Sequence, residues 1–154
     1  MTGQPVPRSP TLAAAHTGAR AVLLDTCAAI WLMNGDPLSA ASREAIAAAQ
    51  SGGQVHISPI SAWEIATLAS RGRLTLTLSP AAWFTALLAQ PGVTLAPMPP
   101  SILIASATLP GSPPRDPADR IIAATAREHG LIIITRDTEL VPYAESGHLE
   151  AIAC

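Results

Sequence analysis

The sequence contains no lysine, few aromatic residues and few charges of either sign. All 9 basic residues are arginines, which excludes mechanisms that need a lysine, such as a Schiff base or a P-loop. Aromatic residues make up 3% of the chain, which argues against a stacking platform for single-stranded nucleic acid. A net charge of −2 excludes a generically basic nucleic-acid binder and a polybasic membrane-surface protein. Because only 13% of residues are charged, the placement of the 11 acidic residues is informative.

Long apolar runs and closely spaced cysteines are missing as well. The apolar runs fall short of the roughly 18 residues that a membrane span needs, and the amino terminus lacks the pattern of a signal peptide. Cys27 and Cys154 are too few and too far apart for a disulfide framework or a zinc site. These absences predict a reduced, cytoplasmic protein with no membrane segment.

The length of 154 residues and a hydrophobic content of 49% indicate a single domain with a sizeable core. Residues 1–18 carry three prolines and no clear periodicity, so we expect a flexible amino-terminal extension there. The domain itself is expected to span residues 20–154.

Short apolar segments alternate with helical segments along that domain. Strands are predicted at 21–24, 54–58, 93–96 and 131–135, and residues 148–152 are a candidate edge strand. Helices are predicted at 26–33, 39–50, 59–72, 80–90, 100–108 and 116–129, and irregular chain is predicted at 138–146. This alternation predicts an α/β fold with a parallel, doubly wound sheet.

Five of the acidic residues fall where these elements meet. Asp25 follows the first strand, Asp137 follows the most apolar strand by two residues, and Asp116 and Asp119 lie three apart at a helix start. Glu64 lies early in the helix after the second strand. The carboxyl ends of parallel strands meet at one edge of a sheet, so a single crevice there can collect these side chains. Such a carboxylate cluster needs cations, and all-oxygen ligands favour Mg²⁺ or Mn²⁺.

Each of these acids also has an ordinary structural explanation. Asp116 before a proline is a typical helix N-cap, and Asp119 in the first turn favours the helix dipole. Asp25 and Asp137 can be turn residues, and Glu64 can be a surface charge. The joint placement at one end of one sheet is what favours a site.

Hydroxyl groups and arginines lie beside the same segments. The hydroxyls can bind a ligand carboxylate or a water, or they can satisfy helix and strand ends. Six of the 9 arginines can form a basic rim for a phosphate backbone, or they can be helix-end and surface charges: Arg71, Arg73, Arg115, Arg120, Arg127 and Arg136. The candidate substrate-binding residues are Thr26, Ser61, Arg115, Arg120, Thr135 and Arg136.

Two further residue types have interpretations that do not involve catalysis. Cys27, with no histidine near it in sequence, is interpreted as a small buried apolar residue. The three tryptophans are interpreted as core or interface anchors.

Four stretches in order, LLDTCAAIWL (23–32), ISPISAWEIATLASRGRL (57–74), DPADRIIAATA (116–126) and IIITRD (132–137), resemble the PIN-domain family. Within it they resemble the VapC-type toxins of bacterial toxin–antitoxin pairs, and the resemblance covers residues 21–153. It implies a three-layer α/β/α fold with a central, mostly parallel sheet of four to five strands. It also implies a Mg²⁺-dependent ribonuclease, a homodimer, and inhibition by a cognate antitoxin protein.

The family motifs match residue by residue. The resemblance assigns Asp25, Glu64, Asp119 and Asp137 as catalytic carboxylates and metal ligands, with Asp116 as a further participant. The chain departs from many relatives in two places. It has Leu68 or Ala69 where they carry a lysine, and Pro114 where they carry a histidine. Both departures affect expected RNA contacts and leave the carboxylates unchanged.

Other classes fit less well. A haloacid-dehalogenase-type phosphatase needs a second aspartate two residues after the first, where this chain has Cys27, and it also needs a lysine. A receiver domain likewise needs a lysine. The remaining alternative is a non-catalytic PIN-like module that binds RNA or an antitoxin.

Overall fold

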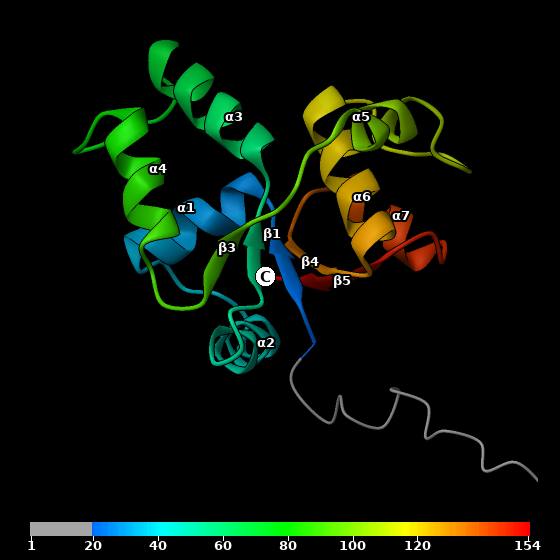
Figure 1. Ribbon diagram of the computed structural model, residues 1–154, viewed down its shortest axis with the longest axis horizontal. Coiled ribbons are helices and arrows are strands. Elements are labelled where there is room, and N and C mark those ends of the chain that lie inside the picture. Colours follow the sequence, from blue (N-terminus) through cyan, green and yellow to red (C-terminus); the bar gives the residue numbers. More distant parts are fainter. Residues whose placement is uncertain (1–19) are drawn as a thin grey trace, which may run out of the picture.

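The computed structural model describes residues 20–154; the extension predicted at residues 1–18 lies outside them. The elements, drawn in Figure 1, are β1 (Val22–Leu24), α1 (Thr26–Asn34), α2 (Ala40–Gln50), β2 (Val55–Ile57), α3 (Pro59–Ser70), α4 (Pro80–Leu88), β3 (Val93–Leu95), α5 (Pro100–Ala107), α6 (Pro117–His129), β4 (Ile132–Thr135), α7 (Leu140–Glu145) and β5 (Glu150–Ala153). Among residues 20–154 no helix is both long and apolar enough to cross a membrane.

The five strands form one sheet in the order β3-β2-β1-β4-β5, and every neighbouring pair is parallel. The predicted parallel sheet is therefore confirmed, with β5 as one edge strand and β3 as the other. Leu24 at the end of β1 lies opposite Ile57 and Ile134. The chain leaves β1 toward β2 and later returns on the other side at β4, so the strand order reverses between β1 and β4. In open α/β sheets the binding crevice lies at such a reversal, outside the carboxyl ends of the strands.

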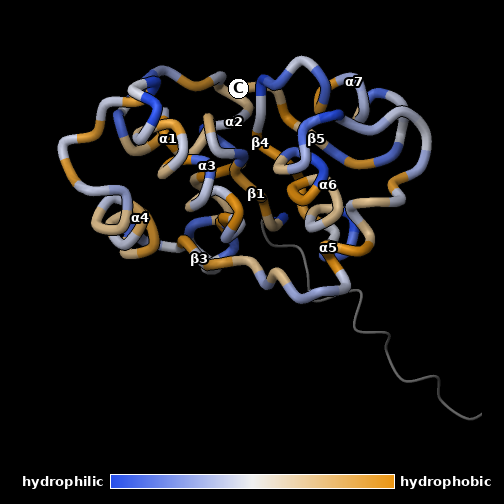
Figure 2. The backbone as a smooth tube through the Cα atoms, turned by 90° about the horizontal axis from the view of Figure 1, so that it is seen from above, coloured by the Kyte–Doolittle hydropathy of each residue, from blue (hydrophilic) through white to orange (hydrophobic). Residues whose placement is uncertain are grey.

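Helices cover both faces of the sheet, which gives three layers. In Figure 2, α1, α2 and α4 lie on one side of β1 and β4, and α5, α6 and α7 lie on the other. The strand period of two explains this arrangement. Val22 and Leu24 face a core that includes Ile46 and Leu87, whereas Leu23 faces a second core around Ile122. Burial of both faces requires the nearly continuous apolar strands that the sequence shows.

The helix starts follow the capping signals in the sequence. The hydroxyls of Ser39, Ser58 and Ser79 accept hydrogen bonds from the backbone N–H groups of Ser42, Ile60 and Ala82 in α2, α3 and α4. A proline occupies the first position of α3 and α4, where its missing N–H costs nothing. These caps fix where α3 begins, and so where Glu64 lies relative to β1.

One prediction about the elements is wrong. Residues 138–146 were expected to be irregular, but α7 spans Leu140–Glu145. Leu140 and Tyr143, three residues apart, are both buried in the second core, and this burial stabilises a helix too short to form alone. Pro142 is the third helical residue, where the N–H group would have no partner within the helix.

Candidate active site

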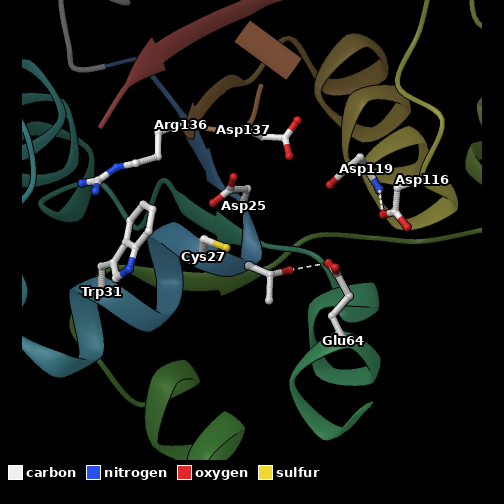
Figure 3. A pocket seen from close by; sticks show the side chains of 9 residues that line it. Asp25, Cys27, Trp31, Glu64, Asp116, Asp119, Arg136 and Asp137 are labelled. Carbon is white, nitrogen blue, oxygen red and sulfur yellow. Dashed lines mark hydrogen bonds between the residues drawn. The ribbon is translucent and has the colours of Figure 1, made fainter. Parts of the chain in front are cut away.

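Four elements bring their ends to one crevice at the carboxyl edge of the sheet (Figure 3). Asp25 follows β1 directly, and Asp137 lies two residues beyond β4. Asp116 and Asp119 come from the start of α6, and Glu64 comes from the second turn of α3. The crevice has a volume of about 270 Å³ and is lined by Asp25, Thr26, Cys27, Trp31, Glu64, Asp116, Asp119, Arg136 and Asp137. All five acids predicted from the sequence therefore meet in one place.

Asp25 is fixed on both carboxylate oxygens. Its Oδ1 accepts a hydrogen bond from the backbone N–H of Ala28 at 2.7 Å, which makes Asp25 the N-cap of α1. Its Oδ2 accepts a hydrogen bond from the hydroxyl of Thr135 on β4. The side chain is only 4% exposed, and burial raises the pKa of Asp25 despite these two donors. Asp25 therefore caps α1 and also lines the crevice.

Glu64 is held by a short chain of hydroxyl groups. Its Oε1 accepts a hydrogen bond from the Thr26 hydroxyl, and Thr26 Oγ1 lies 2.9 Å from Ser61 Oγ. Because Thr26 gives its only hydroxyl proton to Glu64, Ser61 is the donor in the second bond. Burial is the main cause that raises the pKa of Glu64, and neighbouring carboxylates add to it.

Asp137 orients the turn into α7. Its Oδ1 accepts hydrogen bonds from the backbone N–H groups of Glu139 at 2.8 Å and Leu140 at 2.9 Å. Its own N–H donates to Thr135 Oγ1 at 3.0 Å. The Thr135 hydroxyl thus accepts from Asp137 and donates to Asp25, which links two of the predicted metal ligands through one buried side chain.

Asp119 lacks such support. Among the described residues no hydrogen bond reaches its carboxylate; its backbone N–H donates to Asp116 Oδ2 at 3.1 Å, so Asp116 is the N-cap of α6. Burial, and then the charges of Asp137, Asp116, Glu64 and Asp25 in that order, raise the pKa of Asp119 to about 8. This shift means that the crevice, as it stands, favours a proton or another cation on Asp119.

The thiol of Cys27 is affected by the same carboxylates. Its side chain is exposed and lines the crevice, which corrects the expectation that it is buried. Burial of part of the thiol and the four nearby carboxylates, led by Asp25, raise the pKa of Cys27 to about 11. The thiol therefore stays protonated near neutral pH, so Cys27 does not act as a nucleophile.

The donor set of the crevice fits a hard divalent cation. Its acidic groups are all carboxylates, and the raised pKa of Asp119 shows that their charges are not neutralised by the protein. Within residues 20–154, no three His, Cys, Asp or Glu side chains lie close enough to hold a metal ion together. Mg²⁺ usually binds one or two carboxylates and keeps several waters, so the set fits a hydrated ion and not a closed cage.

The three hydroxyl residues expected at the site support carboxylates. Ser61 and Thr135 are fully buried behind Glu64 and Asp25, and neither lines the crevice. Thr26 reaches the crevice, but its proton is used by Glu64. The expected direct substrate contact of Ser61 and Thr135 is thus corrected to a positioning role.

Arg120 has a structural position. Its Nε, Nη1 and Nη2 donate to the carbonyl oxygens of Ser106 at 2.9 Å, Pro114 at 3.1 Å and Ala107 at 3.2 Å. These bonds give partners to carbonyl oxygens at the end of α5 and hold the following loop against α6. Arg120 does not line the crevice and makes no ion pair with a described acid, so its expected substrate contact stays a prediction.

Most of the other arginines also lie outside the crevice. Arg115 lines a separate hollow, and its backbone N–H donates to Glu139. Arg71 and Arg73 are exposed at the end of α3, and Arg127 donates to a backbone carbonyl oxygen. Arg136 is the one arginine of residues 20–154 that lines the crevice.

The sequence interpretation missed the place of Trp31. Trp83 lies in the core as expected, but Trp31 lines the crevice, and the guanidinium of Arg136 lies 3.8 Å from the centre of its ring. A signal for this was available, since Cys27 and Trp31 are four residues apart and share a face of α1.

Comparison with known proteins gives matches over most of the domain. The model of the PIN domain matches residues 22–145. Ribonuclease VapC22 of Mycobacterium tuberculosis (strain ATCC 25618 / H37Rv) is 37% identical over 124 residues, which cover 77% of this chain and 88% of that protein.

Solved structures share the fold at lower identity. VapBC2 from Rickettsia felis, bound to a DNA fragment from their promoter, has a TM-score of 0.60 at 12% identity, covering 86% of this chain and 98% of that chain. DNA-bound VapBC from Salmonella typhimurium has a TM-score of 0.54 at 20% identity, covering 87% and 98%. The expected three-layer fold is confirmed by these likenesses and by the sheet itself.

Proposed function

The chain belongs to the PIN-domain family, and we propose that it is a metal-dependent endoribonuclease that acts as the toxin of a toxin–antitoxin pair. Its similarity to Ribonuclease VapC22 supports a ribonuclease. The observation that carries the proposal is the crevice in which five acids meet and the pKa of Asp119 rises to about 8. Such a site costs free energy unless a cation occupies it, and hydrolysis of a phosphodiester uses that cation.

We propose Mg²⁺ as the cation, with Mn²⁺ as a second candidate. Asp25, Asp119 and Asp137 would hold it, one or two of them directly and the rest through bound waters, and Glu64 and Asp116 would bind through water or support a second ion. When bound, such an ion stabilises charge on the phosphoryl group and activates a water for attack.

The residues themselves supply geometry and proton acceptors. The N–H of Ala28 and the hydroxyl of Thr135 fix both oxygens of Asp25, so that it needs little reorganisation when ligands arrive. Glu64 has one oxygen held by Thr26, which leaves the other oxygen for a water in the crevice. The thiol of Cys27, with a pKa of about 11, stays protonated and does not compete as a nucleophile.

Cleavage of RNA by the purified protein tests this proposal. We expect cleavage with Mg²⁺ and none with excess EDTA. Asp25→Asn should reduce cleavage by roughly 10³-fold or more, because several kcal/mol of charge stabilisation depend on the metal ligands. Asp36→Asn, an exposed acid outside the crevice, is the matched control and should cleave normally.

Absent cleavage, or cleavage that ignores EDTA, would instead favour a non-catalytic PIN-like module that binds RNA or an antitoxin. An Asp25→Asn protein that is folded and fully active would contradict the assignment of the site.

We also propose a cognate antitoxin, a homodimer and a cytoplasmic location. The solved VapBC structures contain partner complexes, which supports the first. The homodimer follows the family resemblance, and Trp63 on α3 and Ile104 on α5, which are 61% and 69% exposed, are apolar side chains available for such an interface. Both cysteines are free thiols, in keeping with a reducing compartment. Co-expression with the neighbouring reading frame and sedimentation of the purified protein test the partner and the dimer.

A further inference from the structure

The crevice has a cationic end opposite its acids. Figure 3 shows Arg136 and Trp31 at one side and Asp116 and Asp119 at the other, with Asp25 between them. Arg136 is the only basic side chain of residues 20–154 among those that line the crevice. A cavity with separated charges fits a ligand that has separated charges, or an anion bound together with a cation.

Arg136 is held in place by an aromatic ring and by two main-chain oxygens. Its guanidinium carbon lies 3.8 Å from the ring centre of Trp31. Its Nε donates to the main-chain oxygen of Cys154, the last residue, at 2.6 Å, and its Nη2 donates to that of Pro37 at 3.4 Å. The ring and the two main-chain oxygens come from α1, from the chain after β5 and from the chain before α2, so three separate segments orient one guanidinium. The side chain is thus arranged before any ligand binds.

Arg136 makes no direct contact with the carboxylates, although its charge acts on Asp25 from a distance and opposes the rise that burial causes in the pKa of Asp25. In residues 20–154 the ion pair between side chains is Arg20–Glu150, and Arg136 makes none with an Asp or Glu side chain. Its Nη1 has no hydrogen-bond partner among these residues, and the side chain is exposed. A counter-ion for the acids would contact one of them, as Arg20 contacts Glu150.

We propose that Arg136, supported by Trp31, binds an RNA phosphate next to the phosphate that is cleaved at the carboxylate end. This inference rests on the proposed function, and it names how the substrate lies in the crevice. Phosphate suits this guanidinium because phosphate oxygens accept charge-assisted hydrogen bonds from N–H groups such as those of Arg136 Nη1. Because Arg136 covers the face of Trp31, the ring orients the arginine and does not stack on a base.

Binding measured without cleavage tests the inference. The probe is a fluorescein-labelled pool of short random oligoribonucleotides, and the parent protein is Asp25→Asn, with anisotropy recorded over a range of salt. Adding Arg136→Gln should weaken binding about three- to ten-fold and reduce the slope of log affinity against log salt by about 1. Adding Arg136→Lys should keep the slope but weaken binding. Lysine keeps the positive charge but lacks the planar set of N–H donors of the guanidinium.

Two controls separate this role from general charge and from folding. Arg43→Gln removes an exposed arginine on α2 outside the crevice and should change neither affinity nor slope. Trp31→Leu keeps Arg136 but removes its support, and should weaken binding by a smaller factor at an unchanged slope. Thermal melting of each variant checks that it is folded.

Cleavage by proteins with intact Asp25 gives the second readout. Arg136→Gln should raise KM for RNA and leave kcat within about two-fold, since a neighbouring phosphate contact acts on binding more than on chemistry. Unchanged affinity, slope and KM would overturn the inference, as would a loss confined to kcat. If the wild type cleaves no RNA with Mg²⁺, the proposed function fails, while the anisotropy series still decides whether Arg136 holds a phosphate.

Discussion

Asp25 and Asp119 face the same crevice, but the fold holds their carboxylates in opposite ways. Asp25 is buried where β1 meets α1, and both of its oxygens accept hydrogen bonds from the protein. Asp119 lies on the first turn of α6, and no hydrogen bond among the described residues reaches its carboxylate. Burial raises the pKa of both, but only Asp119 is shifted to about 8.

The difference shows that one site contains a carboxylate held rigidly by donors and another whose negative charge is left unbalanced. Donors around Asp25 stabilise its ionised form and fix its direction, so it can serve as a preset ligand. Asp119 receives the repulsion of the other acids without compensation. A bound cation would reduce this repulsion. Substitutions can remove first the support of the fixed carboxylates and then the charge of the unsupported carboxylate.

Among the substitutions that remove support for a carboxylate, Thr135→Val is expected to have the largest effect. This change removes the hydroxyl that donates to Asp25 and accepts from the N–H of Asp137. Loss of such an orienting contact costs about 10- to 100-fold in metal affinity or activity. The measurement is kcat/KM for RNA cleavage at a fixed Mg²⁺ concentration.

Thr125→Val is the matched control for that substitution. Thr125 is equally buried, but its hydroxyl bonds the Ile121 carbonyl within α6 and touches no acid. Equal losses of activity in the two variants would show that the effect comes from stability and not from positioning.

A smaller loss, of roughly ten-fold or less, is expected from Thr26→Val. Thr26 supports Glu64 through one oxygen, and Ser61 supports Thr26 in turn. Thr26→Ser keeps the hydroxyl and should restore most of the activity, although the buried methyl group is lost. If the serine variant is as impaired as the valine variant, the hydroxyl chain does not position Glu64.

The smallest effect concerns stability. The pKa of Asp119 is raised from 3.8 to about 8, so the folded state binds its proton more tightly than the unfolded state does. Its contribution to stability is full below the ordinary pKa and is lost as the pH rises through about 8. Without metal above pH 8, Asp119→Asn should therefore stabilise the fold by about 1 kcal/mol. Urea unfolding in EDTA measures this.

The control for that stability change is Asp36→Asn. Asp36 is exposed in the chain after α1 and lies outside the crevice. It should change stability little at any pH. An Asp119→Asn protein that is less stable than the wild type above pH 8 would contradict the repulsion argument.

Much of the fold was readable because apolar runs and helix caps are local signals. The run ending at Asp25 and the run before Arg136 are strands, and Ser39 and Asp116 cap helices as expected. Residues 138–146 were misjudged because α7 depends on burial of Leu140 and Tyr143, which is a tertiary effect. Propensity alone cannot show which side chains the rest of the chain will cover.

The candidate site likewise contains residues that the sequence predicts and residues that it does not. The five acids were predictable from their places at strand ends and helix starts, which the topology brings together. The arginines were not, because a guanidinium reaches far and its partner depends on the fold. Arg120 binds three carbonyl oxygens near α5, whereas Arg136 reaches the crevice over Trp31. Their sequence neighbourhoods did not distinguish them.

Calorimetric titration of Mg²⁺ at pH 7, in buffers with different ionisation enthalpies, tests most directly whether these carboxylates jointly hold a divalent cation. With a pKa of about 8, Asp119 is mostly protonated at that pH, so binding should release about one proton. Asp119→Asn should release clearly fewer protons, and Asp25→Asn should bind Mg²⁺ much more weakly. No Mg²⁺ binding by the wild type, or binding with no proton release, would contradict the account.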